Sequence, residues 1–163
     1  MADGNDPFGL ASRLASLEAT AAQLNRASDS INGIINAVEK QLSAANVGLE
    51  VWLRPPLTQT DAQGFTGLER ETVWTEDRLG YAKVNGKWCI AVKDVRVHTG
   101  RFEGDTSCPY TNECVDGMPI PLTQASRETR IAALDRLPDL IEALEAQAKS
   151  ALQKVQKATK LVS

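Results

Sequence analysis

Histidine and cysteine, from which many catalytic and metal sites are built, are scarce in this sequence, which has one histidine and three cysteines among 163 residues. An odd number of cysteines fits a reducing compartment better than a framework of disulfides. The glycine-rich phosphate loop, the dinucleotide-binding fingerprint and the G-x-S-x-G nucleophile motif are all missing. We therefore find no sign of nucleotide binding or hydrolase chemistry, and we expect no cofactor.

Long apolar runs and an excess of one charge are missing as well. The N-terminal segment MADGNDPFG lacks the basic and apolar regions of a secretory signal. No run approaches the roughly 18 apolar residues of a membrane span. The formal net charge is −3, which is too small to indicate nucleic acid as a partner. We expect a cytoplasmic protein that binds neither membrane nor nucleic acid.

What is present is the composition of an ordinary folded protein, with 42% apolar and 24% charged residues. The length fits a single domain, residues 1–163, whose core needs no metal or disulfide. The patterns predict an α+β fold made of a helix over residues 7–45, a β module over 46–125 with loops at 54–72 and 99–121, and a helix over 126–162.

The predicted helix 7–45 carries a long apolar stripe. Asp6 can cap the helix, and Pro7 suits its first turn. Apolar residues follow at alternating spacings of four and three, and only Ser28 interrupts them. The stripe consists of Leu10, Leu14, Leu17, Ala21, Leu24, Ser28, Ile31, Ile35, Val38, Leu42 and Ala45. A heptad pattern held over about five repeats indicates a coiled-coil-like seam.

The predicted helix 126–162 has a stripe of the same spacing, from Leu134 to Val162. Pro138 lies inside it and predicts either a kink or a short break followed by a restart. The segment 149–163 has four lysines and no acid, which is a pattern that can contact anionic lipid or nucleic acid. Because its apolar side has no aromatic anchor, a solvated lysine face is the favoured interpretation.

The two predicted helices have similar lengths and lie at the two ends of the chain, which favours an antiparallel pair. A lone pair would leave half of each seam exposed, so we expect a homo-oligomer that forms through these helices. The residues expected at the interface lie in the middle of the seams. They are Leu24, Ile31, Ile35, Ile141 and Leu144.

Within the β module, Asn85-Gly86 joins two alternating segments and is typical of a type I′ hairpin turn. This turn pairs Val84 with Lys87 and, further along, Leu79 with Val92. One face of the hairpin then collects large residues and the other small ones. The large set is Leu79, Tyr81, Trp88, Ile90 and Val92, and the small set is Gly80, Ala82, Cys89 and Ala91. We expect the large face in the core, and a bulge at residues 93–94, where the parity of the apolar residues changes.

His98, Cys108 and Cys114 are the candidate metal ligands of the segment 98–117. Their spacing is looser than that of zinc sites, and the sequence does not single out a fourth ligand among Asp105, Glu113 and Asp116. Free thiols are the favoured interpretation, and a local disulfide or a metal site remains an alternative. His98 could also act as a general base toward either cysteine, although no known catalytic signature surrounds it. We expect no bound metal.

Together these patterns favour a non-enzymatic interaction or structural module that self-associates through its helices. Loops on a rigid scaffold commonly carry binding, so the β module would face a further protein partner. The alternative hypothesis is a small-ligand or metal-binding protein, or a weak enzyme, built on residues 98–117.

Overall fold

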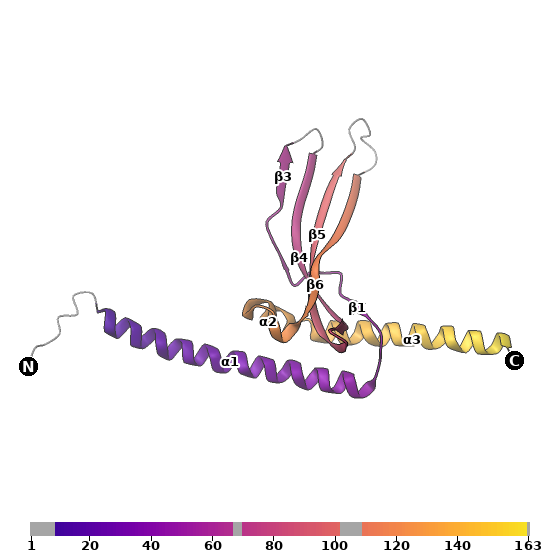
Figure 1. Cartoon of the computed structure of the whole chain (residues 1–163), viewed down its shortest axis with the longest axis horizontal. Helices are drawn as coiled ribbons and strands as arrows, with labels where there is room; N and C mark the ends of the chain where they lie inside the picture. The colour runs from indigo at the N-terminus through magenta and orange to yellow at the C-terminus, as the bar shows by residue number, and fades with distance from the viewer. Residues whose placement is uncertain (1–8, 67–69, 102–108, 163) are drawn as a thin grey trace, which may run out of the picture.

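The computed structural model describes residues 9–66, 70–101 and 109–162 and has the predicted α+β class (Figure 1). Its elements, in chain order, are α1 (Leu10–Ala45), β1 (Val51–Trp52), β2 (Thr58–Gln59), β3 (Gln63–Thr66), β4 (Arg70–Val84), β5 (Lys87–Arg101), β6 (Pro109–Pro121), the 3-10 helix η1 (Leu122–Gln124), α2 (Arg127–Leu134) and α3 (Leu137–Val162).

The strands form one antiparallel sheet in the order β1-β4-β5-β6. β1, β2 and β3 are short and pair one after another along the same edge of β4, while β5 occupies its other edge. The sheet is therefore four strand positions wide. The lower part of the β4–β5 hairpin lies against the helices, and the upper part rises away from them (Figure 1).

The hairpin turn and its register are confirmed. Asn85 and Gly86 both have positive φ, at 49° and 83°, as a type I′ turn requires. The predicted pairs run from Val84 with Lys87 to Leu79 with Val92. The predicted irregularity lies at the expected place, but in the pairing of β5 with β6 rather than with β4. The register with β6 shifts between Val92 and Asp94, whereas the register with β4 continues unbroken.

The large face of the hairpin is the core face, as predicted. Its residues Leu79, Tyr81, Ile90 and Val92 are buried in one cluster with residues of the helices. The helical members of this cluster are Ile35, Ala133, Leu137, Leu140 and Leu144. Trp88 is half-buried and stacks on Tyr81, with 5.6 Å between the ring centroids. Both long helices thus bury their inner halves on the same face of the sheet.

The small face is covered as well. Val84, Cys89 and Ala91 are buried in a second cluster, against which Trp52 packs. Burial raises the pKa of the Cys89 thiol, which keeps it protonated and is typical of a structural cysteine. Gly80 and the other small residues of this face therefore leave room for one tryptophan.

The predicted loops at 54–72 and 99–121 are wrong in large part. The first contains β2, β3 and the start of β4, and the second contains the end of β5 and all of β6. β6 is an edge strand, and most of its residues are exposed on both faces. Such a strand shows no alternation of apolar and polar residues, because neither face is deeply buried.

The C-terminal helix is broken as Pro138 predicted. α2 ends at Leu134 and α3 begins at Leu137, which places the proline in the first turn of α3. Ser126 caps α2, since its hydroxyl accepts a hydrogen bond from the backbone N–H of Thr129 at 3.1 Å.

The predicted antiparallel pair of long helices does not form within the chain. In Figure 1, α1 and α3 run in the same direction, and the N-terminus of α1 and the C-terminus of α3 lie at opposite ends of the molecule. α1 packs mainly on α2 and β5, and α3 packs on β1 and β4. The reason is that the apolar face of the sheet covers the inner half of the α1 seam and the side chains of Leu137, Leu140 and Leu144 on α3, so each helix packs on the sheet and not along the other helix.

Candidate functional site

The outer half of α1, residues 10–27, projects from the body of the molecule (Figure 1). Leu14, Leu17 and Leu24 on its seam are 49%, 62% and 45% exposed. On the inner half, the same seam is covered: Ser28 and Ile35 are buried, and Ile31 is half-buried. The apolar stripe of α1 is therefore buried in the core along the inner half of the helix and exposed along the outer half.

α2 marks the border between these two halves. The Arg127 guanidinium donates to Asn25 Oδ1 at 2.9 Å, and Arg130 donates to Asn32 Oδ1 at 2.6 Å. The two asparagines are seven residues apart, so α2 lies along two turns of α1. From residue 25 onward, the body of the molecule occupies the space beside the helix.

The outer half of α3 projects at the opposite end (Figure 1). Leu152 and Val155 on its apolar side are exposed, and so are Lys149, Lys154 and Lys157. This segment is strongly basic, whereas the outer half of α1 carries only Arg13, Glu18 and Arg26 as charged residues.

The five predicted interface residues do not form the single helix–helix layer that was expected. Ile35 and Leu144 are buried in the shared core, and Ile31 packs against that core. Leu24 and Ile141 are exposed. Leu24 lies on the projecting half of α1, where no part of the described body covers it. Ile141 lies in the inner half of α3 and is exposed because α3 buries Leu137, Leu140 and Leu144 instead.

A polar groove lies on the upper part of the sheet, on the face that continues from the core. Its volume is about 520 Å³, and Glu71, Arg96 and His98 contribute its charged or titratable side chains together with Asp61. His98 Nδ1 lies 2.8 Å from Glu71 Oε1. On the other side of this pair, a second groove of about 340 Å³ is lined by Glu71, His98, Tyr110, Asn112 and Cys114.

The structure thus brings two of the three candidate ligands, His98 and Cys114, to one groove, while Cys108 lies outside the described residues. Glu71 was missed because it belongs to the segment that was predicted to be a loop. Within the described parts of the chain, no group of three or more His, Cys, Asp or Glu side chains is arranged to hold a metal ion.

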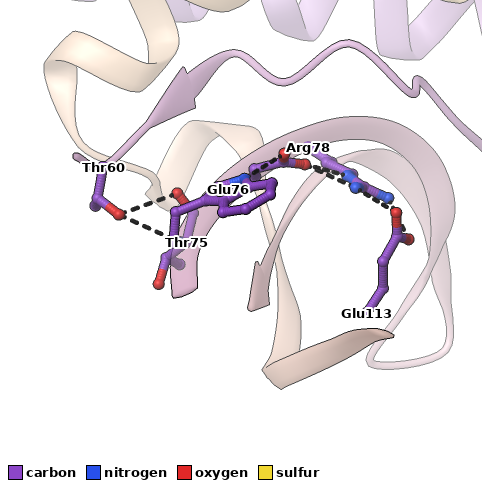
Figure 2. A network of polar contacts seen from close by, with 6 residues as sticks. Thr60, Thr75, Glu76, Arg78 and Glu113 are labelled. Atoms are coloured by element: carbon purple, nitrogen blue, oxygen red, sulfur yellow. Dashed lines mark hydrogen bonds and ion pairs between the residues drawn. The ribbon is translucent and has the colours of Figure 1, made fainter. Parts of the chain in front are cut away.

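A network of charged side chains covers the opposite face of the sheet. Arg78 lies between two carboxylates (Figure 2): it donates to Glu76 Oε2 at 2.7 and 2.9 Å and to both oxygens of Glu113 at 2.8 and 2.9 Å. Trp74 Nε1 donates to Glu76 Oε1 at 2.8 Å. Hydrogen bonding to Glu113 raises the pKa of Arg78, and the guanidinium lowers the pKa of Glu113.

This network lies over buried valines. Val95 is paired with Glu76, and Val97 is paired with Trp74 on one side and Glu113 on the other, so all five side chains share a face. Both valines are almost completely buried. The stems of the long charged residues and the indole therefore act as the cover of a small apolar layer.

Three aspartates form a row across the sheet. Asp94 on β5 is paired with Asp77 on β4 and with Asp116 on β6. Asp77 accepts hydrogen bonds from the hydroxyls of Thr58 and Thr129, and Asp116 accepts one from Arg96 at 2.5 Å. Partial burial and the two neighbouring carboxylates raise the pKa of Asp94.

Comparison with protein-family models, with curated proteins and with solved structures finds no match to this chain. Among the described residues, no helix has a run that is long and apolar enough to cross a membrane.

Proposed function

We propose that this chain is a non-enzymatic structural or interaction module that self-associates through the outer half of α1. The observation that carries the proposal is the row of half-exposed leucines at residues 14, 17 and 24 on a projecting helix. Burying a leucine side chain contributes about 1.5–3 kcal/mol. Association that covers this row would therefore supply several kcal/mol of favourable free energy.

Single exposed apolar residues are normal on protein surfaces and need no explanation. These leucines differ because they are aligned at spacings of three and seven along one helix face. They also continue the stripe that is buried further along the same helix. An aligned row of this kind is a surface suited to another helix with the same pattern.

The upper part of the sheet would then present the surface for a further protein partner. It rises away from the helices (Figure 1). The edge strand β6 runs from this upper part down toward the helices and exposes Val115, Met118 and Ile120 in its middle and lower parts. An exposed strand edge with apolar side chains can pair with a segment of another chain.

Sedimentation equilibrium on wild type and on Leu17→Asp tests the self-association. We expect a concentration-dependent oligomer for the wild type and a monomer for Leu17→Asp, because the variant would place an unpaired charge in the buried layer. Ala19→Asp is the matched control: Ala19 is exposed and lies on the opposite side of α1, so this variant should still associate.

Both variants lie outside the core cluster, so the thermal unfolding of the β module should change little in either. A wild type that is strictly monomeric at high micromolar concentration would contradict the proposal. Equal association of Leu17→Asp and Ala19→Asp would place the interface elsewhere on the molecule.

The second candidate function is binding of a small ligand or a metal ion beside the Glu71–His98 pair. It is favoured by one observation, the meeting of His98 and Cys114 at a groove that also holds a carboxylate. Elemental analysis of protein purified without chelator tests the metal. One metal per chain that is lost in both His98→Ala and Cys114→Ser would support the metal site, and no metal after incubation with added zinc would contradict the metal site.

A further inference from the structure

The inner half of α1 restricts how a second copy can approach the outer half. This restriction deepens the proposed function and rests on it. We infer that two copies pair their α1 helices antiparallel, over the outer halves alone, with the overlap centred on residue 19. Leu14 of one copy then meets Leu24 of the second, and Leu17 meets Ala21.

Steric overlap with the body of the molecule determines whether the second α1 helix runs parallel or antiparallel. From residue 28 onward, the seam of α1 is covered by its own body, with Ser28 and Ile35 buried and α2 lying alongside residues 25–32. A parallel partner that follows the outer seam would continue into the space that α2 and the sheet occupy. An antiparallel partner runs the other way, so the bodies of the two copies lie at opposite ends of the pair.

The length of the projecting segment of α1 fits this overlap. Residues 10–27 span about 27 Å at 1.5 Å per residue. With the twofold axis at residue 19, each residue lies beside the residue of the second copy for which the two numbers sum to 38. Leu10 at the N-terminal end of one outer half therefore lies beside Ser28 of the other copy. The contact ends at the point where the body begins to cover the seam.

Side-chain size agrees with the antiparallel arrangement. A parallel pair in register would stack Ala21 on Ala21, which leaves a poorly filled layer between leucine layers. In the antiparallel pair, each Ala21 faces a Leu17, so two layers combine one large and one small side chain. Alternation of large and small residues fills space better than uniform layers.

The charged residues favour the parallel arrangement, which steric overlap excludes, and this conflict provides an experimental test. In a parallel coiled coil, Arg13 of one helix lies beside Glu18 of the other, five residues along. In the antiparallel pair, Glu18 lies near the twofold axis and faces the Glu18 of the second copy. Exposed charge pairs contribute only about 0.2–1 kcal/mol, which is far less than a steric overlap costs. The cost of the steric overlap therefore outweighs the free energy of the charge pair.

Glu18→Gln distinguishes the two directions by the sign of its effect on the dissociation constant. The antiparallel pair loses a repulsion, so the dimer should tighten by about two- to five-fold at low salt, and the gain should fade as salt is added. A parallel pair loses the attraction to Arg13 and should weaken. Glu142→Gln on α3, an exposed residue outside the overlap, is the control and should leave the constant unchanged.

Spin labels give a second readout that does not depend on charge. With Cys108 and Cys114 replaced by serine, labels are placed at Ser12→Cys or Ala19→Cys, which are seven residues apart on the outward side of α1. In the antiparallel dimer, the label pair at residue 19 has no axial offset, whereas the pair at residue 12 is offset by about 21 Å. The distance should therefore be longer at residue 12.

Equal distances at the two positions, or a weaker Glu18→Gln dimer, would overturn the antiparallel arrangement. These outcomes differ from failure of the proposed function itself. If the wild type is monomeric, self-association fails. If the wild type associates and Leu17→Asp does not, self-association stands and only the direction is in question.

Discussion

The indole of Trp52 lies directly over Gly80, its cross-strand partner on β4. A Cβ atom added at residue 80 would lie 2.2 Å from Cε3 of the indole and 2.5 Å from the carbonyl oxygen of Val51. Lys93 Nζ lies 4.2 Å from the centroid of the indole, and the indole N–H donates to Glu50 at 2.6 Å. One tryptophan, held from several sides, thus covers the small face of the hairpin.

Replacing Gly80 with alanine should destabilise the fold by about 3 kcal/mol. The added methyl group meets a ring and a backbone carbonyl, and neither can move without disturbing β1, so the cost is that of an overpacked core. Urea unfolding measures this change. Gly33→Ala on the exposed face of α1 is the control, and it should stabilise by about 0.5–1 kcal/mol because glycine disfavours a helix interior. A Gly80→Ala variant as stable as the wild type would contradict the packing of Trp52.

Replacing Arg78 with methionine should cost about 3 kcal/mol. The apolar stem remains over Val95 and Val97, but Glu76, which is buried, loses the only cation that the structure gives it among the described residues. Adding Glu76→Gln to this variant should restore part of the loss, because no buried charge is then left unpaired. Chemical unfolding of the two single variants and the double variant measures the coupling. Additive effects would show that the pair is not coupled.

Glu39 on α1 fixes the helix to the sheet through the backbone of β5. Its Oε1 accepts the N–H of Ile90 at 3.0 Å, and burial raises the pKa of its carboxyl group. Glu39→Ala leaves that N–H without its acceptor and should cost about 1–2 kcal/mol. Glu39→Gln keeps an acceptor and removes the buried charge, so its stability at pH 7 should equal or exceed that of the wild type. A glutamine variant as unstable as the alanine variant would show that the charge itself matters.

The hairpin could be predicted because local signals agreed. Asn85-Gly86 specifies the turn, and the alternation beside it distinguishes the core face, so register and burial followed together. The break before Pro138 had an equally local cause. These are features that short segments determine without knowledge of their surroundings.

The features of the fold and of the candidate site that could not be predicted depend on contacts between distant segments of the chain. β6 has no apolar alternation, so only its hydrogen bonds with β5 make it a strand. The Glu71–His98 pair follows from the hairpin register, which places His98 opposite Val73 and hence diagonal to Glu71. It was missed because the register was not continued past residue 92. The heptad stripes predicted the helices, but they did not predict the surfaces on which the helices pack, because a sheet and a second helix can both cover a row of leucines.

The stability of the fold should depend on pH through Asp94, which stands between Asp77 and Asp116. Its pKa is raised above the ordinary value of 3.8, so the folded chain keeps this proton to a higher pH than the unfolded chain does. Stability therefore falls as pH rises through the raised pKa, and the charged form carries the penalty at pH 7. Asp94→Asn should remove that penalty, with a gain on the order of 0.5 kcal/mol at pH 7, because the side chain reaches solvent. Thermal unfolding from pH 3 to pH 8 measures it. The gain should shrink as the pH falls through about 4 and become small near pH 3, where the wild-type carboxyl is mostly protonated in both states. A gain that is constant across this range would rule out the titration of Asp94 as its cause.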